Sequence, residues 1–178
     1  ASSEHMTSQL LQWRGFIHAL HGKRQNAIDD IELATEMRLR AGGPFFTGYH
    51  LAVKGAVLAF LDQLEEARNC LEEAMTVAEQ IPSPYIQACA MSYLCYIDLK
   101  SGSEAEAISR LRTLLELMID SGYDFFWGWE PASMLQLLSH AVKHNIEPDF
   151  AKQLARQRLL QSLDKDGKPL PMLVIKVL

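Results

Sequence analysis

The stretch "KGAVLAFLDQLEEARNCLEEA", residues 54–74, decides the fold because its pattern occurs three times in the chain. It aligns without a gap with "RGFIHALHGKRQNAIDDIELA" (14–34) and with "LCYIDLKSGSEAEAISRLRTL" (94–114). The spacing between successive copies is 40 residues each time. A fixed period of this size indicates a stack of repeated structural units, each of which buries its apolar face against its neighbours.

The matched columns of this alignment predict how two helices pack within each unit. A small residue in the first helix lets the second helix approach closely, a small residue on the second helix faces it, and a large apolar residue follows one turn later. These repeat-packing residues are Gly15, Gly55 and Cys95, then Ala27, Ala67 and Ala107, then Ile31, Leu71 and Leu111. Gly22 and Gly102 mark the tight turn between the helices, where a positive φ costs least in glycine.

The sequence therefore predicts an all-α fold, a right-handed superhelical stack of antiparallel helix pairs. The pairs cover about 8–40, 46–80 and 85–120, and a fourth, less regular pair covers 131–162. Ser103 with Glu106 predicts a capping box at the start of one helix. The opening "ASSEHM" (1–6) is interpreted as a cloning scar outside the fold.

The last residues break the helical pattern. "PLPMLVIKVL" (169–178) alternates apolar side chains with a period of two, which is typical of a strand. A lone strand cannot satisfy its backbone hydrogen bonds. We therefore interpret 163–178 as a linker and an isolated strand of a truncated following domain.

Composition favours a protein of the cytoplasm. The formal net charge is −5, which argues against a surface that contacts nucleic acid directly. The three cysteines, Cys70, Cys89 and Cys95, form no CxxC motif, and this fits buried thiols in a reducing compartment. No apolar run approaches the roughly 20 residues that span a bilayer, so no membrane contact is expected.

The helix-pair units resemble tetratricopeptide repeats, which share the glycine in the first helix and the alanine followed by a large residue in the second. The period differs, since it is 40 here and about 34 in that family. His18, Leu58 and Asp98 stand where the family has tyrosine. Longer units of this kind are similar to those of large bacterial transcriptional activators of the MalT-like, LuxR-type class, and "HNIEPDF" (144–150) resembles their junction with a winged-helix DNA-binding domain.

This resemblance implies a non-catalytic sensor or protein-interaction module. Its partners would be the nucleotide-binding and DNA-binding domains of the parent activator, together with a small-molecule effector or a partner protein. No GxxxxGK[ST] motif is present, so no cofactor is expected. The alternative is a stand-alone adaptor that binds a peptide or a helix in its concave groove. Self-association through the apolar ends of the array is expected in either case.

Aromatic residues supply the candidate site. "PFFTGY" (44–49) and "YDFFWGWEP" (123–131) concentrate rings where one pair meets the next, and the register places others on the first helices. The predicted ligand or partner groove consists of Phe16, Tyr49, Phe60, Tyr96, Lys100 and Trp129. Such a groove suits an apolar or sugar-like effector or a partner helix. The same rings can instead seal the joints between pairs, and both interpretations stay open.

Catalytic and metal sites are not predicted. His140 and His144 are four residues apart, a spacing that can hold a metal, and Glu147 follows them. However, Ala141 stands where a zinc protease motif has glutamate, and no third ligand can be placed from the sequence. We therefore interpret the two histidines as partly exposed residues at a helix end. No nucleophile–base pair or buried carboxylate pair is found either.

Overall fold

The regular structure of this chain is entirely helical in the computed structural model, which describes residues 2–159 and 166–168. The helices are α1 (Ser2–Leu20), α2 (Arg24–Ala41), α3 (Pro44–Phe60), α4 (Leu64–Gln80), α5 (Pro84–Lys100), α6 (Glu104–Ser121), α7 (Pro131–Lys143) and α8 (Pro148–Leu159). The all-helical prediction is confirmed over these ranges. The strand predicted at 171–178 lies outside the described residues, as does most of the predicted linker.

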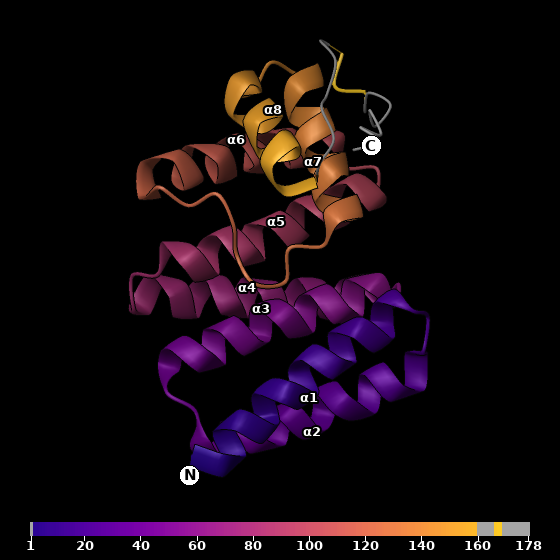
Figure 1. The fold of residues 1–178 in the computed structure, drawn as a ribbon, viewed down its shortest axis with the longest axis vertical. Coiled ribbons are helices and arrows are strands. Elements are labelled where there is room, and N and C mark those ends of the chain that lie inside the picture. Colours follow the sequence, from indigo (N-terminus) through magenta and orange to yellow (C-terminus); the bar gives the residue numbers. More distant parts are fainter. Residues whose placement is uncertain (1, 160–165, 169–178) are drawn as a thin grey trace, which may run out of the picture.

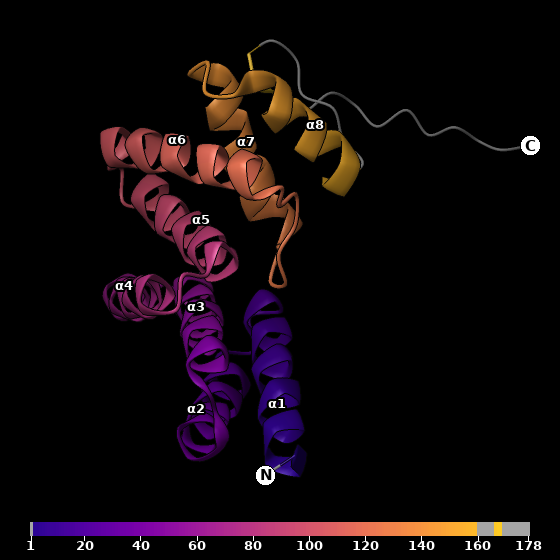
Figure 2. The same ribbon diagram turned by 90° about the vertical axis from the view of Figure 1, so that its left-hand side faces the viewer.

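The helices pack as consecutive pairs, α1 on α2, α3 on α4, α5 on α6 and α7 on α8. Figure 1 shows the pairs following one another in chain order from the N-terminal end to α7 and α8. The first helices of successive pairs also contact each other, since α3 packs on both α1 and α5, and α5 packs on α7. In Figure 2 the connection between α6 and α7 reaches back toward α1, where Gly128 lies beside the Trp13 ring. No helix in the described part of the chain has both the length and the apolar character needed to cross a membrane.

The turns within the first three pairs share one conformation. The predicted positive φ is confirmed at Gly22 (68°) and Gly102 (78°), and Asp62 holds the same place in the register with φ 63°. A non-glycine residue is strained in this region. The Asp62 carboxylate, however, pairs at 2.6 Å with Nζ of Lys100, the last residue of α5.

The same turn geometry explains why the capping-box prediction is wrong. Ser103 is the N-cap of α6, but its side chain accepts no hydrogen bond from the helix. Its ψ is 63°, and the N-caps of α2 and α4, Lys23 and Gln63, have ψ 68° and 64°. These values lie well below the β-region that points an N-cap side chain at the exposed N–H groups. The repeated turn therefore overrides the local capping preference of serine.

Helix α1 begins at Ser2, earlier than the start near residue 8 that the repeat predicts. The extra turn is held by His5, whose ring lies edge-on to Phe46 with centroids 4.3 Å apart. Its Nδ1 also lies 2.8 Å from Arg38 Nη1. The stretch interpreted as a cloning scar is therefore helical from Ser2 on and packs on α2 and α3.

The predicted packing columns meet between the helices of each pair. A methyl group added at Gly55 would lie 2.5 Å from Leu71 Cγ and 3.1 Å from Ala67 O. At Gly15 it would lie 3.2 Å from Ala27 O. In the third pair Cys95 Sγ lies 4.0 Å from Ala107 O. Glycine thus relieves an overlap with Leu71 at the second crossing and a tight contact at the first, whereas the third crossing accommodates the small side chain of Cys95.

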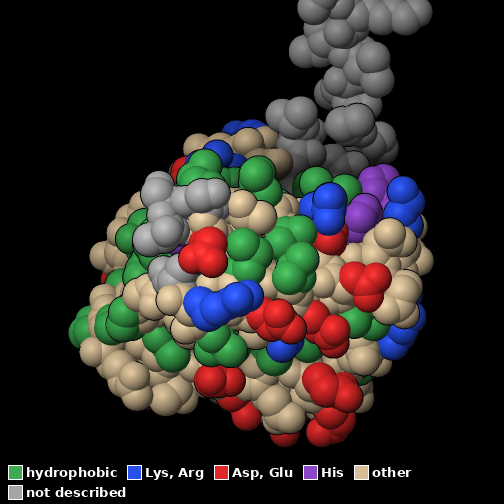
Figure 3. Space-filling model, turned by 90° about the horizontal axis from the view of Figure 1, so that it is seen from below, with side chains coloured by type: hydrophobic (Ala, Val, Ile, Leu, Met, Phe, Trp, Pro, Cys, Tyr) green, Lys and Arg blue, Asp and Glu red, His purple; other side chains and the backbone are tan. Residues whose placement is uncertain are grey.

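The first pair exposes apolar side chains at its outer end, where green groups gather in the view of Figure 3. Ile17 on α1 is 52% exposed, whereas its register equivalents Val57 and Ile97 are 0% and 1% exposed. Positions that α3 and α5 bury against a preceding pair are thus uncovered on α1. The self-association predicted from the sequence remains a prediction.

A small polar cluster is buried where α1, α2 and α3 meet. His50 is 2% exposed, with Nδ1 2.9 Å from Gln12 Oε1 and Nε2 2.8 Å from Thr35 Oγ1. Thr35 donates its own proton to Ile31 O at 2.7 Å. Burial, with a smaller contribution from Arg38, lowers the pKa of His50 to about 3. The imidazole is therefore neutral at neutral pH.

The helix crossing gives a stability prediction. Ala67→Leu places three extra heavy atoms where Gly55 and Ala67 face each other, so overpacking should lower the free energy of unfolding by about 1–3 kcal/mol. Urea unfolding followed by circular dichroism measures this change. Ala105→Leu adds the same atoms at an exposed position of α6 and should have little effect. Equal stabilities of wild type and Ala67→Leu would contradict the packing described above.

The buried histidine gives a pH prediction. The unfolded chain titrates His50 near the ordinary pKa of about 6.5, whereas the folded chain keeps it neutral down to about pH 3. Between these values the unfolded state binds an extra proton, so stability falls as the pH falls, by up to about 1.4 kcal/mol per unit. His50→Gln should flatten the slope between pH 6 and pH 4 in urea unfolding, whereas His21→Gln, at an exposed turn, should not.

Candidate functional site

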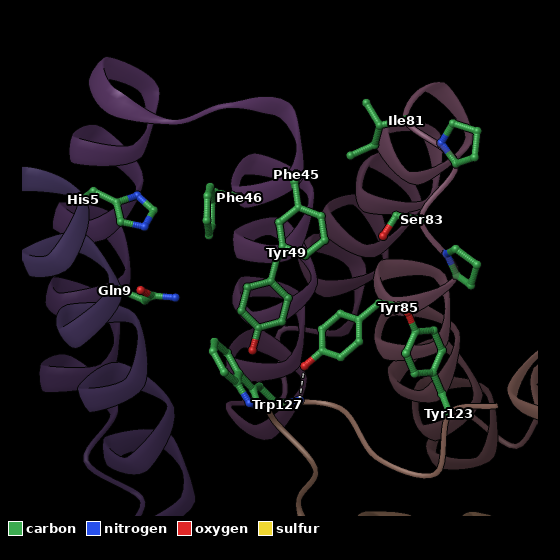
Figure 4. A pocket seen from close by; sticks show the side chains of 12 residues that line it. His5, Gln9, Phe45, Phe46, Tyr49, Ile81, Ser83, Tyr85, Tyr123 and Trp127 are labelled. Carbon is green, nitrogen blue, oxygen red and sulfur yellow. Dashed lines mark hydrogen bonds between the residues drawn. The ribbon is translucent and has the colours of Figure 1, made fainter. Parts of the chain in front are cut away.

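An open pocket of about 780 Å³ lies where the N-terminal ends of α1, α3 and α5 meet the connection between α6 and α7. Figure 4 shows its walls. Six of its lining residues are aromatic: Phe45, Phe46, Tyr49, Tyr85, Tyr123 and Trp127. The others are His5, Gln9, Ile81, Pro82, Ser83 and Pro84. His5 belongs to the stretch interpreted as a cloning scar, and among the lining rings it contacts Phe46.

The repeat places these rings together. Phe45 and Tyr85 are 40 residues apart and occupy equivalent positions at the starts of α3 and α5. Gln9 and Tyr49 are equivalent in the same way, one turn further along α1 and α3. Because the first helices of successive pairs lie side by side, equivalent residues line up across them. The pocket is thus a product of the register.

The rings contact each other around the pocket. Tyr49 is the central ring, with centroid distances of 5.9 Å to Tyr85 and 6.2 Å to Trp127. Tyr85 in turn lies 6.5 Å from Phe45 and 5.7 Å from Tyr123. These distances suit tilted and edge-to-face pairs. Three segments of the chain, α3, α5 and the connection between α6 and α7, therefore present one aromatic surface.

The connection between α6 and α7, residues 122–130, closes one side of the pocket and is held by a stripe of α5. Trp127 N–H donates to Tyr85 Oη at 2.6 Å. One turn further, Cys89 Sγ contacts Trp127 O at 3.9 Å, and after another turn the Tyr93 hydroxyl donates to Gly128 O. Burial raises the pKa of Cys89 to about 12, so its thiol stays protonated. Three side chains on one face of α5 thus fix the backbone of this connection.

The end of the connection is fixed by a helix cap. The Glu130 carboxylate accepts hydrogen bonds from Ala132 N at 2.9 Å and Ser133 N at 2.7 Å. It satisfies two of the free N–H groups at the start of α7. The position of Trp127 is therefore determined from both sides, by α5 and by α7.

The pocket lining carries no aspartate, glutamate, lysine or arginine among the residues that the structure describes. Burial raises the pKa values of Tyr49 and Tyr85 above their usual range, so both phenols are neutral. The Tyr49 hydroxyl is buried and has no hydrogen-bond partner in the structure. The chemistry on offer is apolar contact, ring stacking and a few hydroxyl groups.

Four of the six predicted groove residues form a separate row. Phe16 lies 5.6 Å from Phe60, and Phe60 lies 5.8 Å from Tyr96, measured between ring centroids. Lys100 Nζ sits over the Tyr96 ring at 5.6 Å. Because these side chains pack on one another across α1, α3 and α5, they fill the joints between pairs.

The other two predicted groove residues are separated from each other. Tyr49 lines the pocket, whereas Trp129 does not. The Trp129 ring packs on Phe126 at 5.3 Å and on Phe125 at 6.2 Å, and its Nε1 is buried without a partner. The ring that reaches Tyr49 is Trp127. Trp129 stands 40 residues after Cys89 and 80 after Tyr49, but the segment 122–130 is not helical and does not follow the register.

The sequence prediction missed Phe45, Tyr85, Tyr123 and Trp127 as members of one site. The 40-residue repeat identifies the first two, because Phe45 and Tyr85 occupy equivalent positions and Phe45 lies one helical turn before Tyr49. No such signal exists for Tyr123 and Trp127, whose positions depend on the path of an irregular connection.

The hydrogen bond from Trp127 to Tyr85 gives a prediction about the pocket wall. Tyr85→Phe removes the acceptor and should speed hydrogen–deuterium exchange at the Trp127 amide by about five- to tenfold, since such a bond contributes about 1 kcal/mol. Amide exchange followed by NMR measures this. Tyr96→Phe removes a hydroxyl from α5 on the other row of rings and should leave the Trp127 amide unchanged. Equal exchange in all three proteins would mean that Tyr85 does not hold the connection.

No protein-family model, curated protein or solved structure matches this chain in sequence or fold comparisons. The geometry and chemistry of the pocket are therefore the basis for a functional proposal.

Proposed function

We propose that this chain is a binding module without catalytic activity and that the aromatic pocket is its effector site. In this proposal the helix pairs form a right-handed, tetratricopeptide-like superhelix. The module serves as the sensor region of a bacterial transcriptional activator of the MalT-like, LuxR-type class. It passes effector binding to attached nucleotide-binding and DNA-binding domains.

The observation that carries the proposal is the uncharged aromatic lining of the pocket. Without a charged side chain on the wall, a charged ligand would lose hydration and gain no partner. An apolar or aromatic ligand gains from burial and from stacking on rings such as Tyr49 and Tyr85. A volume of about 780 Å³ also falls within the usual range for small-molecule sites, about 300–1,000 Å³.

The hydroxyl groups on the wall refine this ligand class. Tyr85 Oη accepts from Trp127 N, and Ser83 Oγ accepts from Ile86 N at 3.4 Å as the cap of α5. Each hydroxyl therefore keeps its proton for donation. The ligand that fits best is uncharged, carries an aromatic or apolar ring, and bears a hydrogen-bond acceptor such as a carbonyl oxygen.

One observation favours the alternative, a stand-alone adaptor that binds a peptide or a helix. Phe45, Phe46 and Trp127 are 42%, 36% and 54% exposed at the pocket. Exposed rings beside a pocket can anchor apolar side chains of a partner helix. A reading frame that continues beyond Leu178 into a DNA-binding domain would favour the activator, and a partner helix that competes with the small molecule would favour the adaptor.

The test uses Nile red, a neutral aromatic dye with a carbonyl group, whose fluorescence rises in apolar sites. Phe45→Ser should weaken its binding about tenfold, because it removes about 1–2 kcal/mol of apolar contact from the pocket wall. Phe125→Ser is the matched control. Phe125 is 38% exposed, close to the 42% of Phe45, but it does not line the pocket.

Saturable binding to wild type with the loss confined to Phe45→Ser supports the proposal. Equal affinity in wild type and Phe45→Ser, or equal losses in both variants, would mean that the dye binds elsewhere and that this pocket is not the site. Circular dichroism of each variant checks that the helices are retained.

A further inference from the structure

A second group of side chains, with histidine and carboxylate ligand atoms, lies beside the turn between α5 and α6, away from the aromatic pocket. Glu104 is the first residue of α6, His140 lies in the last turn of α7, and His144 is the C-cap of α7. One ligand atom from each of these three residues lies within 4.8 Å of the other two. The proposed effector site uses none of them.

We propose that Glu104, His140 and His144 bind a zinc ion. Two imidazole nitrogens and one carboxylate oxygen form a donor set common in zinc sites, with a fourth position left for water or an external ligand. The i, i+4 spacing puts both histidines on one face of α7, and their rings are stacked 6.1 Å apart with 9° between the planes. The structure adds what the sequence could not supply, a third ligand 36 residues before His140.

The distances suit the metal. Around a tetrahedral zinc ion with bonds of about 2.0–2.1 Å, neighbouring ligand atoms lie about 3.3 Å apart. Glu104 Oε1 and His144 Nε2 already lie 3.2 Å apart. The remaining separations are at most 4.8 Å, and rotation of the half-exposed Glu104 side chain can shorten its distance to His140.

The group also has free ligand capacity. His140 Nδ1 is buried and has no hydrogen-bond partner among the residues that the structure describes. No protein group bonded at that nitrogen therefore fixes the tautomer of His140, and the ring can adopt the one that zinc requires. The C-terminal end of α7 is the negative end of its helix dipole, which favours a cation there.

One nearby cation competes for the carboxylate. Lys143 Nζ lies 3.4 Å from Glu104 Oε1, but the two side chains are 56% and 53% exposed. Exposed pairs of this kind contribute about 0–1 kcal/mol. Zinc can therefore displace Lys143 without a large loss. Glu147, which follows the histidines in the sequence, is not a member of this group.

The experiment titrates zinc chloride into the chelator-treated, dialysed protein and follows heat release by calorimetry and the unfolding temperature. Wild type should bind one zinc ion per chain at this site and unfold at a higher temperature with zinc, because the ion binds the folded state. Glu104→Gln and His144→Ala should each weaken zinc binding at least about tenfold. Magnesium chloride should have no effect, because magnesium prefers oxygen ligands.

The matched control is His21→Ala, which removes an exposed histidine far from the group and should bind zinc as wild type does. Because Glu104 is exposed, Glu104→Gln should fold normally, and loss of zinc binding in this variant cannot be attributed to unfolding. Wild-type affinity in Glu104→Gln and His144→Ala, or no zinc binding by wild type, would overturn the proposal. Neither outcome affects the aromatic pocket, which the dye titration tests separately.

Discussion

The close approach of the two helices in each pair is the constraint on which the rest of this structure depends. At Gly55 a methyl group would overlap the Leu71 side chain, at Gly15 it would pack tightly against α2, and the third pair accommodates the small side chain of Cys95 at the same place. Because this crossing recurs every 40 residues, each pair presents its first helix to the next pair in the same orientation. Side chains at equivalent positions of α1, α3 and α5 then meet in rows. One row fills the joints, and a row nearer the helix starts leaves the open pocket.

The helix crossing determines which positions meet, but it does not determine which residue types occupy them. Two register positions show this, one on the first helix of each pair and one on the second. They hold His18 and Asp30 in the first pair, Leu58 and Cys70 in the second, and Asp98 and Arg110 in the third. In the first pair the acid is on the second helix, and in the third it is on the first helix, with Asp98 only 2% exposed and bonded to Arg110 and Arg68. The second pair has two apolar side chains there. An acidic residue on either helix, or on neither, is compatible with the same helix crossing.

The periodic part of the fold could be predicted from the sequence, because each helix pair repeats the same local rules. The pair boundaries, the positive φ at Gly22 and Gly102, and the meeting of Gly55 with Ala67 all depend on residues close in sequence or one period apart. The path of 122–130 could not be predicted, since it depends on side chains of α5 that bond to backbone atoms. The approach of Glu104 to His140 depends on how α7 packs against α6, and no local pattern encodes that packing. The strand predicted at 171–178 lies outside the described residues.

The difference between the periodic helices and the irregular connection 122–130 also explains which ligands the pocket can recognise. Its helical walls are set by the register and supply rings, and apolar burial on rings gives affinity with little orientation. Its irregular wall, which depends on Tyr85 and Glu130, decides where Trp127 stands and which hydroxyl protons remain free. Tyr85 and Ser83 each accept a hydrogen bond from a backbone N–H group and keep the hydroxyl proton to donate to a ligand. An acceptor on the ligand would therefore select one orientation among the many that the rings allow. Discrimination between ligands then depends on the irregular connection 122–130, whereas affinity depends on the rings that the helices supply.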